Sequence, residues 1–355
     1  MFLSLLPAAP LVLGADKTAV VPSEIKRYLD PATDFPIQRL TDPAHTSLLP
    51  APYAQAVSRR GNWMIFANDR TGAFQLYRMD LKTGQSRQLT ELEDVEPNSG
   101  TLTADEKTMF CVAGRSVHQL SLGNLRQREV YRIPEGFTFG GGFSISEDGA
   151  YATLVEKRSD RYRLRLVNIA RNAASTVLES PDEISDPVPR PRRAGILYRS
   201  GTRELHVVNF DGAQNQRLRV AGGNVGAALW GQDGRTLTYL NFPEDRKQAN
   251  NVREFTPDAN EDRLVAATSQ FVSFGRNADA SMFVGASGSK ASPFVLLLVR
   301  SVKRELTVAE HKASDPRQVS PRFSLSSQRI FFQSDRHGKW AIYSMQVERF
   351  VEETE

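Results

Sequence analysis

Short apolar runs recur along the whole chain and alternate with clusters of turn-forming residues. Examples are "NWMIFAN" (62–68), "YATLVEK" (151–157), "ELHVVNF" (204–210) and "RIFFQSD" (329–335). Runs of this length that are rich in β-branched and aromatic residues and bounded by Gly, Asp or Asn are typical of β-strands. No capped amphipathic helix of comparable strength occurs. The pattern therefore predicts an all-β protein.

The strands repeat as units, and each unit contains a turn between a polar-alternating strand and a strongly apolar one. The turns are "RRGN" (59–62), "ADEK" (104–107), "EDGA" (147–150), "RRAG" (192–195), "QDGR" (232–235), "NADA" (277–280) and "LSSQ" (325–328). Successive turns lie about 45 residues apart, which is the size of a four-stranded propeller blade. Seven units predict a seven-bladed β-propeller.

The last unit lacks an outer strand. Its "SDRHGKWAIYSM" (334–345) resembles the early "NDRTGAFQLYRM" (68–79), but little chain follows it. Residues 30–42, "DPATDFPIQRLTD", can supply the missing strand from the N-terminal side and close the ring, which removes free sheet edges. We therefore predict a single domain over residues 24–350. The weakest unit is the fourth, because "DPVPRPRRAG" (186–195) carries three prolines, so its strand is short or exposed at the channel.

Composition adds few constraints. The 355 residues are 40% hydrophobic and 24% charged, with a net charge of +4. This permits an acidic partner, but no Lys/Arg block predicts nucleic-acid binding. The single cysteine, Cys111, excludes an internal disulfide and a cysteine-rich metal site, and "TMFCVAG" (108–114) reads as a buried strand.

The N-terminus is apolar and short. "MFLSLLPAAPLVLGAD" (1–16) has the small residues of a signal-peptide end but lacks a basic start. We predict a signal peptide over residues 1–15 and a periplasmic or secreted protein, with a cytoplasmic location as the alternative. No other stretch is long enough to cross a membrane, so no membrane insertion is expected.

The repeats resemble two known groups of propellers. The units 68–91 and 334–345 look like the TolB-type repeat. The fuller pattern, from "YLDPATDFPIQRLTDP" (28–43) to "RQVSPRFS" (317–324) and "IFFQSDRHGKWAIY" (330–343), resembles the oligogalacturonate lyase family. That resemblance implies a seven-bladed propeller that cleaves pectin-derived oligogalacturonates by β-elimination. It also implies a Mn²⁺-type metal held by histidines and a glutamine.

The family's late motif, Gln-Val-Thr-His-Pro-His, reads "QVSPRF" (318–323) here. By resemblance, Gln318 is the one ligand that remains, Arg322 stands beside it, and both histidines are absent. A further ligand histidine of the family follows a serine in the sixth blade, where this chain has Ser269 and Gln270. The resemblance therefore implies a degenerate metal site, with Mn²⁺ bound through Gln318 only if the site survives.

Two other positions of the family also differ. The family's catalytic histidine corresponds to Ala227, in "GAALWGQDG" (226–234). The fourth-blade motif His-Pro-x-Tyr-Arg-Pro reads "DPVPRP" (186–191), which keeps Arg190 and places Asp186 where the family has histidine. The five histidines of the chain show no pair with metal-ligand spacing.

These matches define a candidate site for an acidic oligosaccharide. The predicted substrate-binding residues are Arg190, Arg322, Gln270, Gln318 and Tyr53. Arg190 is also the catalytic candidate, because a guanidinium binds carboxylate bidentately and stays charged, so it can neutralise a uronate in place of a metal. The proton acceptor is not identified by any motif. Tyr53 and His45 are the candidates.

Three functional hypotheses follow. The first is a lyase of uronate oligosaccharides. The second is a non-catalytic exported propeller that binds acidic sugar. The third is a TolB-like scaffold that docks an envelope protein, and fold alone cannot decide among them. The glycine-rich "FTFGGGF" (137–143) lacks the strand-then-helix context of a phosphate loop. We interpret it as a close backbone approach in an inner strand.

Overall fold

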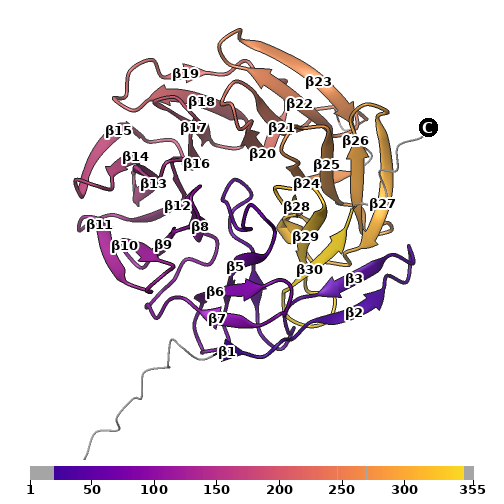
Figure 1. The fold of residues 1–355 in the computed structure, drawn as a ribbon. Coiled ribbons are helices and arrows are strands. Elements are labelled where there is room, and N and C mark those ends of the chain that lie inside the picture. The colour runs from indigo at the N-terminus through magenta and orange to yellow at the C-terminus, as the bar shows by residue number, and fades with distance from the viewer. Residues whose placement is uncertain (1–19, 246, 269, 348–355) are drawn as a thin grey trace, which may run out of the picture.

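Seven antiparallel sheets form a closed ring in the computed structural model, which describes residues 20–245, 247–268 and 270–347. Figure 1 shows the ring viewed along its channel, with the chain running once around it. The prediction of a seven-bladed β-propeller is confirmed. Each blade has its first repeat strand innermost, and the strands that follow it in the repeat lie progressively outward. The N-terminal strands of the chain are added at the outer edges of the first and last blades.

The first four blades follow the chain in order. Blade 1 contains β4 (Ser47–Leu48), β5 (Trp63–Asn68), β6 (Gln75–Asp80), β7 (Ser86–Gln88) and an added outer strand, β1 (Val20–Val21). Blade 2 contains β8 (Thr101–Leu102), β9 (Thr108–Ala113), β10 (Ser116–Ser121) and β11 (Gln127–Arg132). Blade 3 contains β12 (Thr138–Ile145), β13 (Tyr151–Arg158), β14 (Arg161–Asn168) and β15 (Ala173–Ser180). Blade 4 contains β16 (Ile184–Pro189), β17 (Gly195–Ser200), β18 (Glu204–Asn209) and β19 (Gln216–Arg217).

The last three blades include the chain closure. Blade 5 contains β20 (Asn224–Trp230), β21 (Leu237–Phe242), β22 (Asn251–Thr256) and β23 (Glu261–Ala267). Blade 6 contains β24 (Phe271–Arg276), β25 (Met282–Ser287), β26 (Phe294–Val299) and β27 (Arg304–Glu310). The 3₁₀ helix η1 (Pro316–Val319) leads into blade 7, which contains β28 (Arg322–Phe323), β29 (Arg329–Ser334), β30 (Ala341–Gln346), β3 (Pro36–Arg39) and β2 (Lys26–Leu29).

The seven predicted turns join the first and second strands of the blades, and we call them the inner turns. In six blades one residue of the turn has positive φ and donates its N–H to the carbonyl three residues earlier, and we count the hydrogen-bonded inner turn as those four residues. The residues with positive φ, each the fourth of its inner turn, are Gly61, Glu106, Gly149, Gly234, Ala280 and Ser327. This is the geometry of a type I turn followed by a left-handed residue. Blade 4 differs, because Arg192 is the left-handed residue there. The inner turns therefore gather at one end of the channel, which we call the turn mouth. The connections between blades lie at the other end, the crossover mouth.

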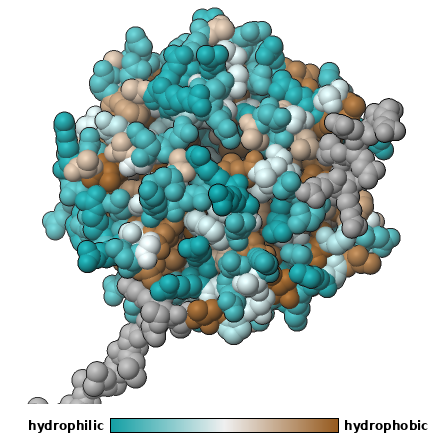
Figure 2. Space-filling view, in the orientation of Figure 1, coloured by the Kyte–Doolittle hydropathy of each residue, from teal (hydrophilic) through white to brown (hydrophobic). Residues whose placement is uncertain are grey.

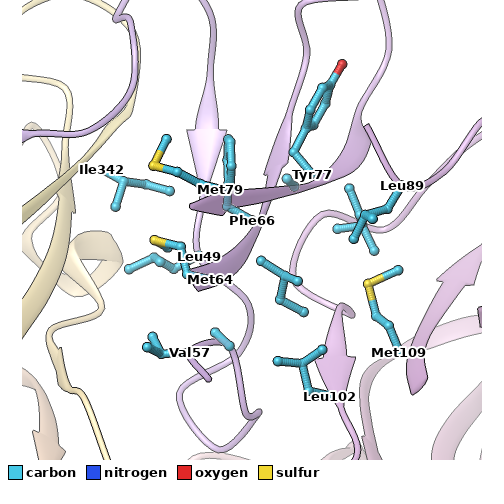
Figure 3. Packing of buried hydrophobic residues seen from close by; sticks show 14 of the residues in the cluster. Leu49, Val57, Met64, Phe66, Tyr77, Met79, Leu89, Leu102, Met109 and Ile342 are labelled. Atoms are coloured by element: carbon cyan, nitrogen blue, oxygen red, sulfur yellow. The ribbon is translucent and has the colours of Figure 1, made fainter. Parts of the chain in front are cut away.

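The ring closes as predicted. The outer strand β3 pairs with β30 through Gln38 opposite Ser344 and Arg39 opposite Tyr343. Figure 3 shows Ile342 of β30 beside residues of blade 1, and Ile342 belongs to the same apolar cluster as Leu49, Met64 and Phe66. Burial of apolar surface between neighbouring blades therefore holds the first and last parts of the chain together.

The fourth blade tolerates its prolines at the inner edge of the sheet. β16 is six residues long, and its ladder with β17 shifts register between Ser185 and Val188. Pro187 lies in this irregular stretch, where no backbone N–H is needed, and its carbonyl accepts hydrogen bonds from Ser144 and Thr153. The strand is thus an edge strand at the channel.

The predicted signal peptide, residues 1–15, lies outside the described residues. Within the described part of the chain, no helix has both the length and the apolar character needed to span a membrane. Figure 2 shows that hydrophilic residues cover most of the visible face, with hydrophobic ones scattered between them. Cys111 is buried, which confirms its expected place in the core, and burial raises the pKa of its thiol to about 12.

Candidate functional site in the central channel

Residues 49–57, between β4 and β5, reach into the centre of the ring (Figure 1), and we call them the channel segment. The backbone N–H of Ala51 donates to the carbonyl of Asn98 at 2.9 Å, and the carbonyl of Gln55 accepts from the N–H of Leu102 at 3.0 Å. Pro52 and Tyr53 line two cavities. The segment therefore borders both.

The inner strands of four consecutive blades, 3 to 6, are bulged. The ladder skips Gly140–Gly142 in β12, Asp186 and Pro187 in β16, Gly226 and Ala227 in β20, and Val272 in β24. Bulges of this kind redirect side chains and are frequent next to active sites. Two of them contain the positions at which the resemblance implies histidines, Asp186 and Ala227. The bulges are therefore present at positions where this chain has other residues in place of the implied histidines.

A small cavity of about 50 Å³ lies at these bulges between blades 4 and 5. Its lining residues are Pro52, Tyr53, Asp186, Leu197, Tyr198, Arg199, Leu205, Ala227 and Ala228. The Nε of Arg199 lies 3.2 Å from Oδ2 of Asp186. The two terminal nitrogens of Arg199 donate to the carbonyls of Val225 and Gly226. Arg199 therefore fixes the bulge of β20 and orients the carboxylate of Asp186.

The structure brings Tyr53 to this cavity. Burial raises the pKa of its phenol, and the nearby Asp186 carboxylate raises it further, whereas the backbone of Phe143 and the Arg199 guanidinium act in the opposite direction. The phenol is therefore protonated at neutral pH and is suited to donate a hydrogen bond. His45, the other candidate base, is 40% exposed and lies 3.8 Å from Asp69. It does not line either cavity.

The two glutamines with predicted ligand roles make other bonds. The side-chain oxygen of Gln270 accepts a hydrogen bond from Ser287 Oγ. Gln318 is exposed in η1, and its side-chain nitrogen donates to Asp315 at 3.1 Å. Ser269, the neighbour of Gln270 in the implied motif, lies outside the described residues. The hydrogen bonds of these two amides are to Ser287 and Asp315, and neither glutamine lines the small cavity.

The two predicted arginines lie toward the turn mouth. Arg190 begins an inner turn, and its side chain donates to the Gly234 carbonyl at 2.7 Å and to Asp258 at 3.0 Å. Arg322 donates to the carbonyl of Pro50 at 2.6 Å and to that of Ala51 at 3.4 Å. These contacts tie blade 4 to blade 5 and blade 7 to the channel segment. The substrate-binding roles of both arginines stay predictions.

The donor set at the implied metal positions does not fit a divalent cation. Among the described residues, no group of three His, Cys, Asp or Glu is arranged to hold one. His311 uses both ring nitrogens, toward the Ser287 carbonyl and the Ala313 N–H. Positions 321 and 323 are Pro and Phe, and between them lies the guanidinium of Arg322, only 7% exposed. A buried cation at this point opposes the binding of another.

The chemistry available at the small cavity is consequently that of a carboxylate and a phenol. Asp186 is 46% exposed, so part of its acceptor capacity faces solvent. Ala227 offers no imidazole. Sequence reasoning missed Arg199, because nothing near "LYRSG" (197–201) marks it. Its partners become adjacent only when blades 4 and 5 pack together.

Several known proteins are similar to this chain in sequence. A sequence model of the family described as oligogalacturonate lyase matches residues 15–166. The oligogalacturonide lyase of Pectobacterium atrosepticum is 22% identical over 92% of this chain and 97% of its own length. The oligogalacturonate lyase of Dickeya dadantii is 22% identical over 90% and 95%.

Two solved structures share the fold. An oligogalacturonate lyase in complex with manganese superposes with a TM-score of 0.87 at 21% identity, covering 93% of this chain and 98% of the other. An oligogalacturonate lyase from Vibrio parahaemolyticus gives 0.86 at 20% identity, covering 94% and 99%. Together with the sequence matches, they confirm the resemblance of this chain to the oligogalacturonate lyase family.

Proposed function

We propose that this propeller binds acidic oligosaccharides of the oligogalacturonate type in its channel and does so without a divalent metal. One observation carries the proposal. Within the motif that resembles the family's metal-binding segment, this chain places the buried guanidinium of Arg322. A guanidinium there attracts the carboxylate of a uronate and disfavours a metal dication. The names of the sequence relatives support the ligand class.

The test is titration calorimetry of the whole protein with trigalacturonate, in Mn²⁺ and in EDTA. We expect saturable binding with the same affinity in both, weakening as salt is added, because the attraction is between charges. Binding that appears only with Mn²⁺ would show that the metal positions have been misassigned. Trigalacturonic acid methyl ester, which lacks the charge, is the matched control and should bind weakly.

A second candidate function is elimination itself, and Asp186 favours it. This carboxylate lies at the small cavity beside Ala227, where the resemblance places the family's base. In elimination the base removes the proton on the carbon next to the uronate carboxylate, and that electron pair forms the carbon–carbon double bond. The glycosidic carbon–oxygen bond breaks, and the leaving oxygen takes a proton.

Ultraviolet absorbance of the unsaturated product tests this reaction. If Asp186 is the base, the wild-type protein generates absorbance with trigalacturonate and Asp186→Asn does not, although the variant still binds. Asp160→Asn, a substitution at an exposed carboxylate in the turn after β13, is the control and should keep full activity. A wild-type protein that binds but yields no product over many hours would establish a binding protein instead.

A further inference from the structure

A cavity of about 680 Å³ opens at the turn mouth, beside the channel segment and the ends of the bulged strands that lead into the inner turns. Residues of all seven inner turns or the strand ends beside them line it, together with Pro52–Val57. We call it the turn-mouth cavity. Its size lies within the range of small-molecule sites, about 300–1,000 Å³. The small cavity at the bulges is far below that range.

The turn-mouth cavity is strongly cationic. Its lining includes Arg59, Arg192, Arg276 and Arg322 against one carboxylate, Glu147. None of the four guanidinium groups forms an ion pair with another residue in the part of the chain that the structure describes. Burial lowers the pKa of Arg276, an effect that the carboxylates of Glu254, Asp233 and Asp279 oppose. Burial also lowers the pKa of Arg322, to about 10, so Arg322 remains charged at neutral pH. The lining itself therefore carries more positive than negative charge.

Three buried N–H groups of the lining residues have no acceptor among the described residues: Gln55 Nε2, Trp230 Nε1 and Arg322 Nε. All three are donors, and none of these lining residues leaves a buried side-chain acceptor unpaired. Buried polar groups in native proteins are nearly always paired. A set of unmatched donors in a cationic cavity is therefore complementary to a ligand rich in negatively charged oxygen.

Trp230 is held in place by Arg190. The guanidinium of Arg190 lies 5.2 Å from the centre of the Trp230 ring, and its own bond to the Gly234 carbonyl fixes it. The stacking covers one face of the indole. Arg190 is thus a positioning residue for Trp230.

We propose that the turn-mouth cavity is a carboxylate-binding site, in which Arg322, Trp230 and Gln55 donate hydrogen bonds to a uronate carboxylate of the ligand. The proposal rests on the proposed function for the identity of the sugar, and on the cavity alone for its charge and donors. It places recognition at the turn mouth, where Arg322 of the segment 318–323 lines the cavity together with residues that the resemblance does not mark, Trp230 and Gln55.

The experiment uses the full chain and two probes, trigalacturonate and citrate, in calorimetry and in tryptophan fluorescence. Trp230→Phe keeps an aromatic ring but removes the indole N–H, and we expect both affinities to fall about tenfold, as for loss of a bond to a charged group. Arg192→Gln changes an exposed turn residue and should weaken binding at low salt, with the loss shrinking as salt rises. Trp63→Phe should keep the ligand-induced fluorescence change, and Trp230→Phe should abolish it.

The controls separate this site from the proposed function. Arg203→Gln, in the turn between β17 and β18, should leave both affinities unchanged. If citrate binds through Trp230 and trigalacturonate does not bind, the cavity site stands and the proposed function falls. If trigalacturonate binds with an affinity that Trp230→Phe and Arg192→Gln leave unchanged, the cavity site falls and the proposed function stands. If neither probe binds, the cavity holds only water and both are overturned.

Discussion

Arg190 is the first residue of its inner turn, a position that is a hydrogen-bond-accepting serine in three other blades. It is Ser58, Ser146 or Ser324 in these blades, and the serine oxygen accepts backbone N–H groups at the end of the same turn. Arg190 cannot accept a hydrogen bond. Its side chain instead crosses to Gly234 in the next blade. A residue that matches a family motif can therefore carry a structural contact.

Arg190→Ala should lower the free energy of unfolding by about 1–3 kcal/mol, because it leaves the buried Gly234 carbonyl without a donor. The ion pair with Asp258 adds little, since that carboxylate is 47% exposed. Urea unfolding monitored by circular dichroism measures the change. Arg193→Ala removes an exposed partner of the same Asp258 and should cost less than about 1 kcal/mol. An Arg190→Ala protein of full stability would show that the bond to Gly234 contributes little to the fold.

The candidate site could be predicted from the sequence only in part, and the reason is physical. Tyr53 and Asp186 could be named, because a resemblance or a loop position marked them. Arg199 could not, because its function depends on carbonyls of the next blade. The burial of Arg322 also depends on the channel segment, which is 272 residues away in sequence. Partners so distant in sequence leave no local pattern.

At the scale of the element, the inner turns were predictable because their chemistry is local. A left-handed fourth residue is the common requirement, and Gly61, Gly149 and Gly234 meet it without steric cost. In blade 7 the same position is Ser327, with φ of 62°. The sequence pattern alone therefore located this turn even without its glycine.

Ser327→Gly should raise the free energy of unfolding by about 0.5–1 kcal/mol. A left-handed conformation costs an L-residue about 1–2 kcal/mol, which glycine avoids. Glycine is also more flexible in the unfolded chain, and this entropy offsets part of the stabilisation. Thermal and urea unfolding both measure it. Ser326→Gly, at the preceding position without positive φ, is the matched control and should destabilise. Destabilisation by Ser327→Gly of equal size would mean that the side chain makes a contact worth more than the strain.

His311 joins the connection after blade 6 to β25 of the same blade through a neutral imidazole. Nε2 lies 3.0 Å from the Ser287 carbonyl, and Nδ1 accepts the N–H of Ala313. Burial lowers the pKa of His311 below its ordinary value, so the folded protein binds fewer protons here than the unfolded chain does. The stability it contributes is present above the unfolded pKa of about 6.5 and is lost as pH falls below it.

Urea unfolding at several pH values between about 7.5 and 5 tests this linkage. The free energy of unfolding should decline with falling pH, and His311→Asn should be less stable at neutral pH with a shallower decline. His118 and His337 also have lowered pKa values, so the difference between variant and wild type isolates His311. Parallel curves for the two proteins would show that His311 does not titrate with unfolding.

At the scale of the whole molecule, closure of the ring was predictable because the strand that closes it can be recognised in a short stretch of sequence. A last blade without an outer strand leaves an edge, and the N-terminal segment repeats the sequence of that strand. The sequence did not show which hydrogen bonds and ion pairs hold the closed ring together. Asp30 accepts the N–H of Glu310 at 3.1 Å and lies 3.3 Å from Arg336. Blades 6 and 7 and the N-terminal segment therefore meet at one buried carboxylate.

Asp30→Ala should lower the free energy of unfolding by about 2–4 kcal/mol, because Asp30 is fully buried and Arg336 is only 6% exposed. Glu310, 3.6 Å from Arg336, compensates part of the lost charge. Asp30→Asn keeps an acceptor oxygen and should cost less. Near-ultraviolet circular dichroism and tryptophan fluorescence should report coincident urea transitions in all three proteins, as one cooperative domain over residues 24–350 requires. Transitions that separate in Asp30→Ala would show that the ring opens at this seam before the blades unfold.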